Sequence, residues 1–273
     1  RQLHRAVPDR YRQRDGVLPQ RRHPPVCPEE AGRLSLLARL LRSGGIGRAA
    51  DAKADPARLA AIGQRVRARL LEDPRAEPRG GHKADIFTLP GFVSAQRCRE
   101  LIALIERQAT PSTLFHDGGG IAAGIRTSST HYFRDNPLAA RLGAQIDALL
   151  GLDRAHAEPM QGQRYRAGEE YRHHSDHFRI ERDHWQRERL RGGQRSWTAM
   201  LYLNAVEAGG ATEFPRLGLM VKPEPGLLIA WNNMDRRGRP NPALLHAGLP
   251  VERGVKYVIT QWYRLEPWVI PSA

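Results

Sequence analysis

The sequence predicts a mainly β domain of the sandwich or jelly-roll class, preceded by a helical extension. After residue 158 the helical pattern fades, and short β-rich runs follow one another, separated by Gly-Gly, Pro-Glu-Pro-Gly and Asn-Asn turns. These runs cover residues 159–166, 197–203, 219–222, 227–232 and 257–264. Before residue 158 the apolar residues recur with helical spacing instead. The chain of 273 residues is long enough for one large domain with an extension.

The N-terminal part is expected to lie outside that domain. Residues 1–27 alternate Arg, Gln and Pro without apolar periodicity, so we expect a disordered basic segment. Residues 28–80 are expected to form a helical extension and a linker, with one amphipathic helix beginning at Pro28 and another after Asp55. We expect both helices to dock on the domain, which would span residues 81–273.

Local signals predict the first elements of the domain. Residues 86–89 are expected to form a strand. Ser94 can cap a helix that runs through Gln108, because a serine side chain accepts a hydrogen bond from an unpaired N–H group of the first turn. Asn136, which precedes a proline, opens another predicted helix that ends at Gly151.

The net charge of +14 at pH 7 comes from 43 basic and 29 acidic residues and raises the question of a nucleic-acid partner. Residues 1–80 hold 18 of the basic residues and only 9 of the acidic ones. The rest of the chain is therefore only mildly basic. We expect no nucleic-acid partner.

Cysteine content and hydropathy bound the class of protein further. Cys27 and Cys98 are too few for a disulfide framework and lie in no CxxC or Cys/His cluster, so neither disulfides nor a zinc site is expected. No segment approaches the run of about 18 apolar residues that crosses a membrane. We expect a soluble, cytoplasmic protein with no membrane partner.

The run from Tyr165 to Phe178, YRAGEEYRHHSDHF, contains candidate ligands of a metal ion. His174 and Asp176 are two residues apart, and in an extended strand residues i and i+2 point to the same face. His246, in LLHAG beside a turn of small residues, can supply a second imidazole. Two histidines and one carboxylate on one side of an octahedral ion form the facial triad of non-haem Fe(II) oxygenases, whereas zinc favours a closed tetrahedron.

A lysine follows His246 by ten residues. Lys256 opens the apolar, strand-like run KYVITQWYR, where its ammonium group is suited to binding the distal carboxylate of a dicarboxylic keto acid chelated to the metal. The alternative is an ordinary lysine at the edge of a strand.

The motifs follow one another in the order YxxGxxYxxHxD, YLN, GGxTxFP, LHAGxPVxxGxK and QWYR. Over residues 85–264 this order resembles the prolyl 4-hydroxylase branch of the Fe(II)/2-oxoglutarate dioxygenases. The resemblance implies an α+β fold with a mainly β catalytic core, a double-stranded β-helix or jelly roll, with supporting helices packed on one side. It also implies an oxidoreductase that uses Fe(II), 2-oxoglutarate, O2 and L-ascorbate, the last to rescue oxidised iron.

The resemblance implies a role for each candidate residue. The residues implied to bind iron, and to be catalytic, are His174, Asp176 and His246. Lys256 and Thr212 would bind the distal carboxylate of 2-oxoglutarate, and Tyr165 would hydrogen-bond near its metal-chelating end. Arg126 in GIRTSS and Arg195 in GGQRSWT match substrate-binding positions of the family. The alternative for both arginines is a solvated or salt-bridged strand residue.

Other histidines surround the metal motif. His173 stands where the family commonly has proline, but the spacing of two to the aspartate selects His174 as the ligand. His177 and His184 are expected to face solvent or to support the ligands from behind. Residues 179–191, RIERDHWQRERLR, are highly charged, and we expect an exposed, mobile loop over the site entrance.

The predicted function is hydroxylation of an unactivated C–H bond, on prolyl residues of a protein or peptide, with release of succinate and CO2. A related alternative is the same chemistry on a free amino acid or another small metabolite. An oxidative nucleic-acid demethylase is less favoured, because the demethylases bind the co-substrate with arginines rather than with a lysine such as Lys256. The last alternative is a non-enzymatic β-sandwich binding module. It is disfavoured, because the agreement with the family at the metal-ligand, lysine and Gly-turn positions would then have to be accidental.

Overall fold

The computed structural model describes residues 51–112 and 125–270, which belong to one compact unit that begins at Ala50. The segment 1–27, predicted to be disordered, and the helix predicted to begin at Pro28 lie outside the described residues.

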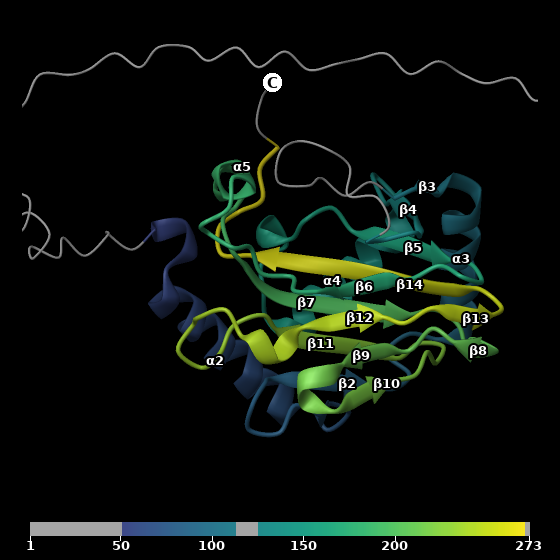
Figure 1. Cartoon of the computed structure of the whole chain (residues 1–273), viewed down its shortest axis with the longest axis horizontal. Coiled ribbons are helices and arrows are strands. Elements are labelled where there is room, and N and C mark those ends of the chain that lie inside the picture. Colours follow the sequence, from purple (N-terminus) through teal and green to yellow (C-terminus); the bar gives the residue numbers. More distant parts are fainter. Residues whose placement is uncertain (1–50, 113–124, 271–273) are drawn as a thin grey trace, which may run out of the picture. The chain divides into compact units, whose positions relative to one another are not determined.

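Two antiparallel sheets form the body of this unit (Figure 1). The strands of the larger sheet are, in spatial order, β1 (Glu77–Pro78), β2 (Ile86–Leu89), β11 (Leu228–Asn232), β7 (Arg195–Tyr202), β14 (Lys256–Arg264), β5 (Gln161–Tyr165), β4 (Ser129–Tyr132) and β3 (Thr110–Pro111). Those of the smaller sheet are β10 (Leu219–Val221), β9 (Thr212–Phe214), β12 (His246–Gly248) and β6 (Tyr171–His174). A short pair joins β13 (Val251–Arg253) to β8 (Ala208–Gly209). The arrangement confirms the predicted jelly-roll core.

Local signals mark where two of the helices among the described residues begin. The α-helices are α2 (Pro56–Glu72), α3 (Ala95–Gln108), α4 (Pro137–Leu150) and α5 (His184–Leu190), and the 3-10 helices are η1 (Ala52–Ala54), η2 (Arg154–His156), η3 (Pro215–Leu217) and η4 (Pro242–Leu244). The side chains of Ser94 and Asn136 accept backbone N–H groups at the starts of α3 and α4, and Gly151 ends α4 with a φ of 64°. In the part of the chain that the structure describes, every helix is too short or too polar to cross a lipid bilayer.

Alternation along β7 shows how the larger sheet is buried on both faces. Ala199 and Leu201 pack in the apolar cluster that also holds the buried faces of α2, α3 and α4. Met200 and Tyr202 point the other way and pack with Phe214 of the smaller sheet. The helices therefore support one face of the large sheet, as predicted, and the opposite face is left to line an interior between the two sheets.

The packing does not change at the predicted boundary of residue 81. α2 buries Val66 and Leu70 in the same cluster as α3, α4 and the large sheet, and Leu59 is buried as well. Residues 51–80 thus belong to the compact unit rather than to a separate extension. This helix docks on the sheet and on the other helices, as expected.

The charged stretch 179–191, predicted as an exposed loop, is in part the helix α5, so that prediction was wrong there. Trp185 and Glu188 of this helix are buried. The indole N–H of Trp185 donates to Asp51 Oδ2 at 2.8 Å, and Glu188 pairs with Arg264 at 2.7 Å. An aromatic anchor and a buried ion pair therefore fix a segment whose composition is typical of a solvated loop.

Candidate metal centre

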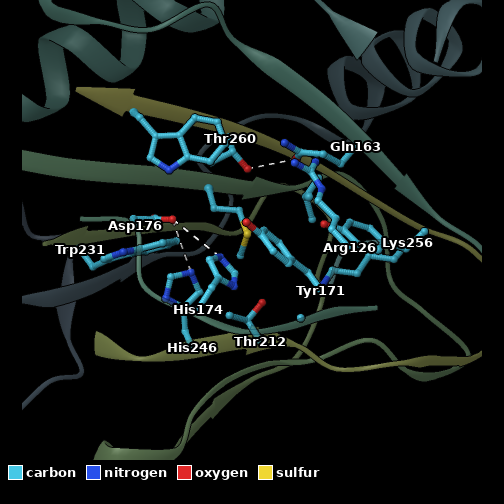
Figure 2. A pocket seen from close by; sticks show the side chains of 15 residues that line it. Arg126, Gln163, Tyr171, His174, Asp176, Thr212, Trp231, His246, Lys256 and Thr260 are labelled. Carbon is cyan, nitrogen blue, oxygen red and sulfur yellow. Dashed lines mark hydrogen bonds and ion pairs between the residues drawn. The ribbon is translucent and has the colours of Figure 1, made fainter. Parts of the chain in front are cut away.

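Two histidines from neighbouring strands face the same aspartate (Figure 2). His174 ends β6 and His246 begins β12, and the two are paired residues in this antiparallel ladder. Asp176 follows β6 by two residues, and its Oδ1 lies 3.7 Å from His174 Nε2 and 3.9 Å from His246 Nε2. The three ligand atoms lie within 4.8 Å of one another, which is close enough to bind one metal ion.

Backbone carbonyls fix the tautomers of both imidazoles. His174 Nδ1 lies 2.8 Å from the carbonyl oxygen of Arg172, and His246 Nδ1 lies 2.9 Å from that of Leu244. A carbonyl can only accept a hydrogen bond, so each Nδ1 carries the proton and donates it. The Nε2 lone pairs are left for a metal ion, and both rings are held in the orientation that presents them.

The protonation states also suit metal binding. Burial, followed by the neighbouring His246, lowers the pKa of His174 to about 3, so this imidazole is neutral near pH 7. Burial alone would raise the pKa of Asp176, but its interactions with His246, His174 and Arg195, together with a hydrogen bond from Thr198, lower it. The carboxylate is therefore ionised, as a metal ligand must be.

The triad lies in a pocket between the two sheets. The other side chains that line this pocket include Arg126, Gln163, Tyr165, Tyr171, Met200, Thr212, Trp231, Lys256, Thr260 and Trp262. The structure thus brings the triad together with four of the other five residues that the sequence nominated. The fifth, Arg195, does not line it.

Lys256 is only 2% exposed and lies in β14, between β5 and β7. This central position excludes the alternative of a strand-edge lysine. Its Nζ lies 5.4 Å from the ring centroids of both Tyr165 and Tyr202, but no hydrogen bond or ion pair to it occurs among the described residues. Burial lowers the pKa of Lys256 to about 7. A buried amine with no protein anion beside it fits a ligand that brings a carboxylate.

Thr212 and Tyr165 lie in the same part of the pocket as Lys256. The Tyr202 hydroxyl donates to Thr212 Oγ1 at 2.6 Å and also approaches the carbonyl oxygen of Val221 at 3.1 Å. Thr212 also lines the pocket, so its hydroxyl is within reach of a ligand there. Tyr165 is the residue paired with Lys256 across β5 and β14.

The two nominated arginines differ in their surroundings. Arg126 lies at the pocket, where it donates to Ser128 Oγ at 2.9 Å and its guanidinium lies 5.2 Å from the ring of Tyr171. Arg195 instead forms a bidentate pair with Glu158, at 2.6 and 2.8 Å. These contacts are those of a salt-bridged strand residue, the alternative to a substrate-binding role for Arg195.

The remaining histidines of the motif do not join the triad. His173 is exposed, and its Nε2 lies 3.0 Å from Glu213 Oε2. His177 is partly buried, which lowers its pKa, and lines a different pocket beside α2. His184 is the first residue of α5, with its ring 6.0 Å from that of Phe178. The spacing of two residues to the aspartate therefore selected the histidine that the structure places beside it.

Two groups of residues around the site were not nominated from the sequence. Tyr171 stacks on the His174 ring, with centroids 3.5 Å apart. Thr198 donates to Asp176 Oδ2 at 2.7 Å. Strand alternation could have found Thr198, because it shares a face of β7 with Met200 and that face lines the pocket. The second group is Arg264 with Glu158 and Glu188, and no local sequence pattern identifies these two glutamates as its partners.

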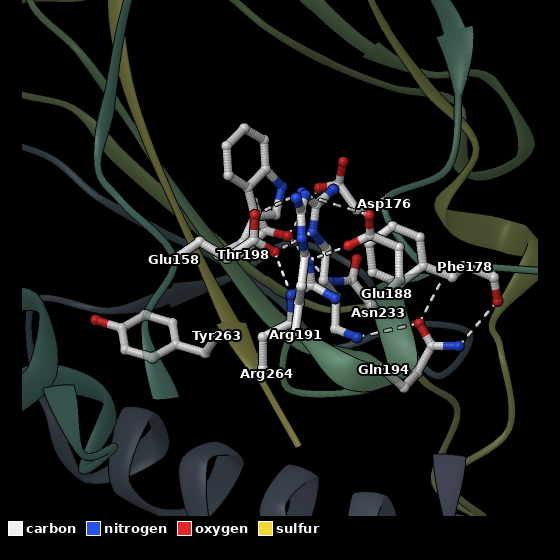
Figure 3. Close-up of polar contacts among 12 residues, drawn as sticks. Glu158, Asp176, Phe178, Glu188, Arg191, Gln194, Thr198, Asn233, Tyr263 and Arg264 are labelled. Carbon is white, nitrogen blue, oxygen red and sulfur yellow. Dashed lines mark hydrogen bonds and ion pairs between the residues drawn. The ribbon is translucent and has the colours of Figure 1, made fainter. Parts of the chain in front are cut away.

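Arg264 joins a buried cluster of charges behind the site (Figure 3). It forms hydrogen-bonded ion pairs with Glu158 and Glu188 and donates to the carbonyl oxygen of Gly193. Glu158 also binds Arg195, so two cations share its carboxylate. The cluster ties α5 to the end of β14.

The chain is similar in sequence to proteins of one enzyme superfamily. The model of the 2OG-Fe(II) oxygenase superfamily matches residues 160–264, which contain the triad and Lys256. Prolyl 4-hydroxylase 2 of Arabidopsis thaliana is 27% identical over 209 residues, covering 67% of this chain and 68% of that protein. The alpha-1 subunit of human prolyl 4-hydroxylase is 36% identical over 128 residues, covering 47% of this chain and 24% of the subunit. This chain thus spans about a quarter of the human subunit.

Solved structures agree in fold. A viral collagen prolyl hydroxylase from Paramecium bursaria Chlorella virus 1, in complex with 2OG, superposes with a TM-score of 0.53 and 28% identity, covering 68% of this chain and 98% of that one. A prolyl hydroxylase of Trichoplax adhaerens, in complex with a peptide fragment of a hypoxia inducible factor, has a TM-score of 0.53 at 16% identity and covers 76% and 90% of the two chains. The second likeness concerns the fold alone.

Proposed function

We propose that this chain is a prolyl 4-hydroxylase-like member of the 2OG-Fe(II) oxygenase superfamily and that it hydroxylates prolyl residues of a protein or peptide. The observation that carries the proposal is the combination of a His-Asp-His triad and a buried, unpaired lysine in one pocket. The triad suits a metal ion with open coordination positions, and the lysine suits a dicarboxylate beside it.

The residues present fit Fe(II). His174 and His246 would bind it through Nε2, and Asp176 through Oδ1. With 2-oxoglutarate and O2, bound Fe(II) supplies the oxidative chemistry that inserts oxygen into an unactivated C–H bond and releases succinate and CO2. L-Ascorbate would act as the reductant that keeps the iron in the Fe(II) state.

Three residues would select 2-oxoglutarate. Lys256 would pair with its distal carboxylate, and the Thr212 hydroxyl would hydrogen-bond to the same group. Tyr165, buried beside Lys256, would hydrogen-bond nearer the metal-chelating end. A carboxylate ion in this position would pair with the protonated amine and so offset the cost of burying that charge.

The lining of the pocket suits a peptide with an apolar ring. Met200 and Trp262 supply apolar lining, and Arg126 supplies a donor that lies over the Tyr171 ring. We propose Arg126 as a contact to the substrate backbone. Arg195 does not line the pocket, and we propose that it contributes to substrate binding through the ring of Trp262, which does. Its guanidinium lies 4.9 Å from the Phe178 ring and 4.5 Å from the Trp262 ring, and Glu158 holds it there.

The test is a screen for succinate release with Fe(II), 2-oxoglutarate and ascorbate, over proline-containing peptides, free amino acids and methylated oligonucleotides. We expect stimulation by peptides and a product 16 Da heavier at proline. The Asp176→Ala variant is the control for background decarboxylation. Stimulation by free amino acids or by oligonucleotides alone would move the activity to a small metabolite or to nucleic acid, and no stimulation by any of them would contradict the proposal.

A further inference from the structure

A hydrogen-bond chain reaches the metal-binding aspartate from behind (Figure 3). Asn233 Nδ2 donates to Thr198 Oγ1 at 3.0 Å, and Thr198 Oγ1 donates to Asp176 Oδ2 at 2.7 Å. Thr198 and Asn233 are 0% and 1% exposed, so water does not compete for these bonds. Thr198 lies in β7, Asn233 directly follows β11, and Asp176 lies in the loop after β6; the two sheets bring them together.

Asn233 fixes the direction of this hydrogen-bond chain. An amide nitrogen can only donate, so Asn233 occupies an acceptor position of the Thr198 hydroxyl. The Thr198 hydrogen is thereby directed to the carboxylate. The backbone of Asn233 is itself anchored, because its N–H donates to the carbonyl oxygen of Ser196 at 2.8 Å and its carbonyl oxygen accepts from the N–H of Asn241 at 3.1 Å.

The hydrogen-bond chain makes the two carboxylate oxygens of Asp176 inequivalent. Oδ1 faces the Nε2 atoms of His174 and His246, while Oδ2 is held by Thr198. A carboxylate that bound through both oxygens would occupy an additional coordination position. The reaction needs three open positions, two for the keto acid and one for O2.

We infer that Thr198 and Asn233 are positioning residues that restrict Asp176 to a single-oxygen metal ligand and hold that oxygen toward the two histidines. The inference rests on the proposed function, because it assigns the purpose of the chain to the iron site. It differs from a purely structural role, in which the two side chains would only fill the interior between the sheets and pair with each other.

The test measures binding of Co(II), used in place of Fe(II), by the visible absorption of the metal-bound protein. Thr198→Val removes the hydroxyl and keeps the branched shape, and we expect Co(II) affinity to fall about 10–100-fold, the usual effect of removing a partner of a metal ligand. The Co(II) spectrum is expected to change as well, because the carboxylate is free to rotate. Thr198→Ser keeps the hydroxyl and should restore both affinity and spectrum.

A buried threonine without such a bond provides the matched control. Thr88 of β2 is 2% exposed, and its hydroxyl has no hydrogen-bond partner among the described residues. Thr88→Val should leave Co(II) affinity and spectrum unchanged. Asn233→Ala should weaken Co(II) binding less than Thr198→Val does, and the double variant should resemble Thr198→Val alone, because both changes break one chain.

The outcomes separate this inference from the proposed function. Thermal unfolding of the metal-free proteins identifies the variants that fold, and Asn233→Ala carries the test if Thr198→Val does not. Co(II) binding by a folded Thr198→Val or Asn233→Ala variant with wild-type affinity and spectrum would overturn the positioning role alone. A wild-type chain that binds no Co(II) or Fe(II) would overturn the proposed function and the inference together.

Discussion

His174 and His246 are paired residues on the antiparallel strands β6 and β12, and their ring centroids lie 4.2 Å apart. Side chains directly opposite each other in such a pair are close neighbours, so the ladder itself brings the two imidazoles close enough to share the proposed metal ion. Asp176, two residues beyond β6, completes the set from the same segment of chain. The metal site therefore depends on one strand pairing.

Replacement of any one triad residue is expected to abolish turnover. His174→Ala, Asp176→Ala and His246→Ala each remove one of three protein ligands from an ion that must keep open positions. The measurement is Fe(II) content after anaerobic loading, together with succinate release. His173→Ala is the matched control, because His173 is exposed and pairs with Glu213 instead. Equal loss of iron in His173→Ala would show that the wrong histidine has been assigned.

Lys256→Ala is expected to weaken 2-oxoglutarate binding by about two to three orders of magnitude. Removal of one partner of a buried pair costs about 3–5 kcal/mol, and about 1.4 kcal/mol corresponds to a factor of ten. Anaerobic titration of the Fe(II) protein, followed by the metal-to-ligand absorption band, measures this affinity. The affinity for pyruvate, which lacks the distal carboxylate, should change little in Lys256→Ala.

A second lysine serves as the control for that prediction. Lys222→Ala removes an exposed lysine and should not alter the affinity for either keto acid. Unchanged 2-oxoglutarate affinity in Lys256→Ala would move the anchor of the co-substrate to another residue.

The affinity for 2-oxoglutarate is expected to fall as the pH rises above 7. The pKa of Lys256 in the free protein is lowered to about 7, and its pairing with a carboxylate requires the protonated amine. Binding at higher pH must therefore take up a proton, which weakens affinity by about tenfold per pH unit. Isothermal titration in buffers of different ionisation enthalpy would detect this uptake between pH 7.5 and 9 as a proton count near one. Lys256→Met should abolish the uptake.

The stability of the ligand-free protein should depend on pH in the opposite sense. The unfolded chain keeps the ordinary lysine pKa of 10.5, so between about pH 7 and 10.5 it binds more protons at this group than the folded protein does. Stability therefore rises with pH across that window as far as Lys256 contributes. Urea unfolding of wild type and Lys256→Met, compared at pH 7 and pH 9, isolates the contribution. A wild-type protein that loses stability relative to Lys256→Met on going to pH 9 would contradict it.

Breaking the buried cluster is expected to destabilise the fold. Arg264→Ala leaves Glu158 and Glu188 with less compensation, and such a change costs about 3–5 kcal/mol of unfolding free energy. Arg253→Ala, which removes an exposed pair with Glu207, should cost about 0–1 kcal/mol. Urea unfolding measures both, and similar small losses would show that the cluster contributes little.

The position of α2 predicts where the chain can be shortened. A chain that begins at residue 81 lacks Leu59, Val66 and Leu70, which are buried in the unit, and we expect it to fail to fold. A chain that begins at Ala50 should fold and bind Co(II). Circular dichroism and Co(II) titration distinguish the two, and normal metal binding by the shorter chain would support the predicted domain limit at residue 81.

The sequence by itself determined what local chemistry decides. Ser94 and Asn136 mark the starts of α3 and α4, because their side chains accept hydrogen bonds from backbone N–H groups of the first helical turn. The two-residue period of an extended chain predicted that His174 and Asp176 lie on the same face. The order of motifs predicted the jelly-roll core and nominated Lys256 as a residue of the site.

Only the tertiary structure decided what joins distant segments. Arg264 meets Glu158 and Glu188 across 106 and 76 residues of sequence, and this pairing turns a charged stretch into the anchored helix α5. Thr198 reaches Asp176 across 22 residues, as an ordinary polar residue in a strand. A buried charge or hydroxyl must find its partner wherever the fold places one, and no local period encodes that place.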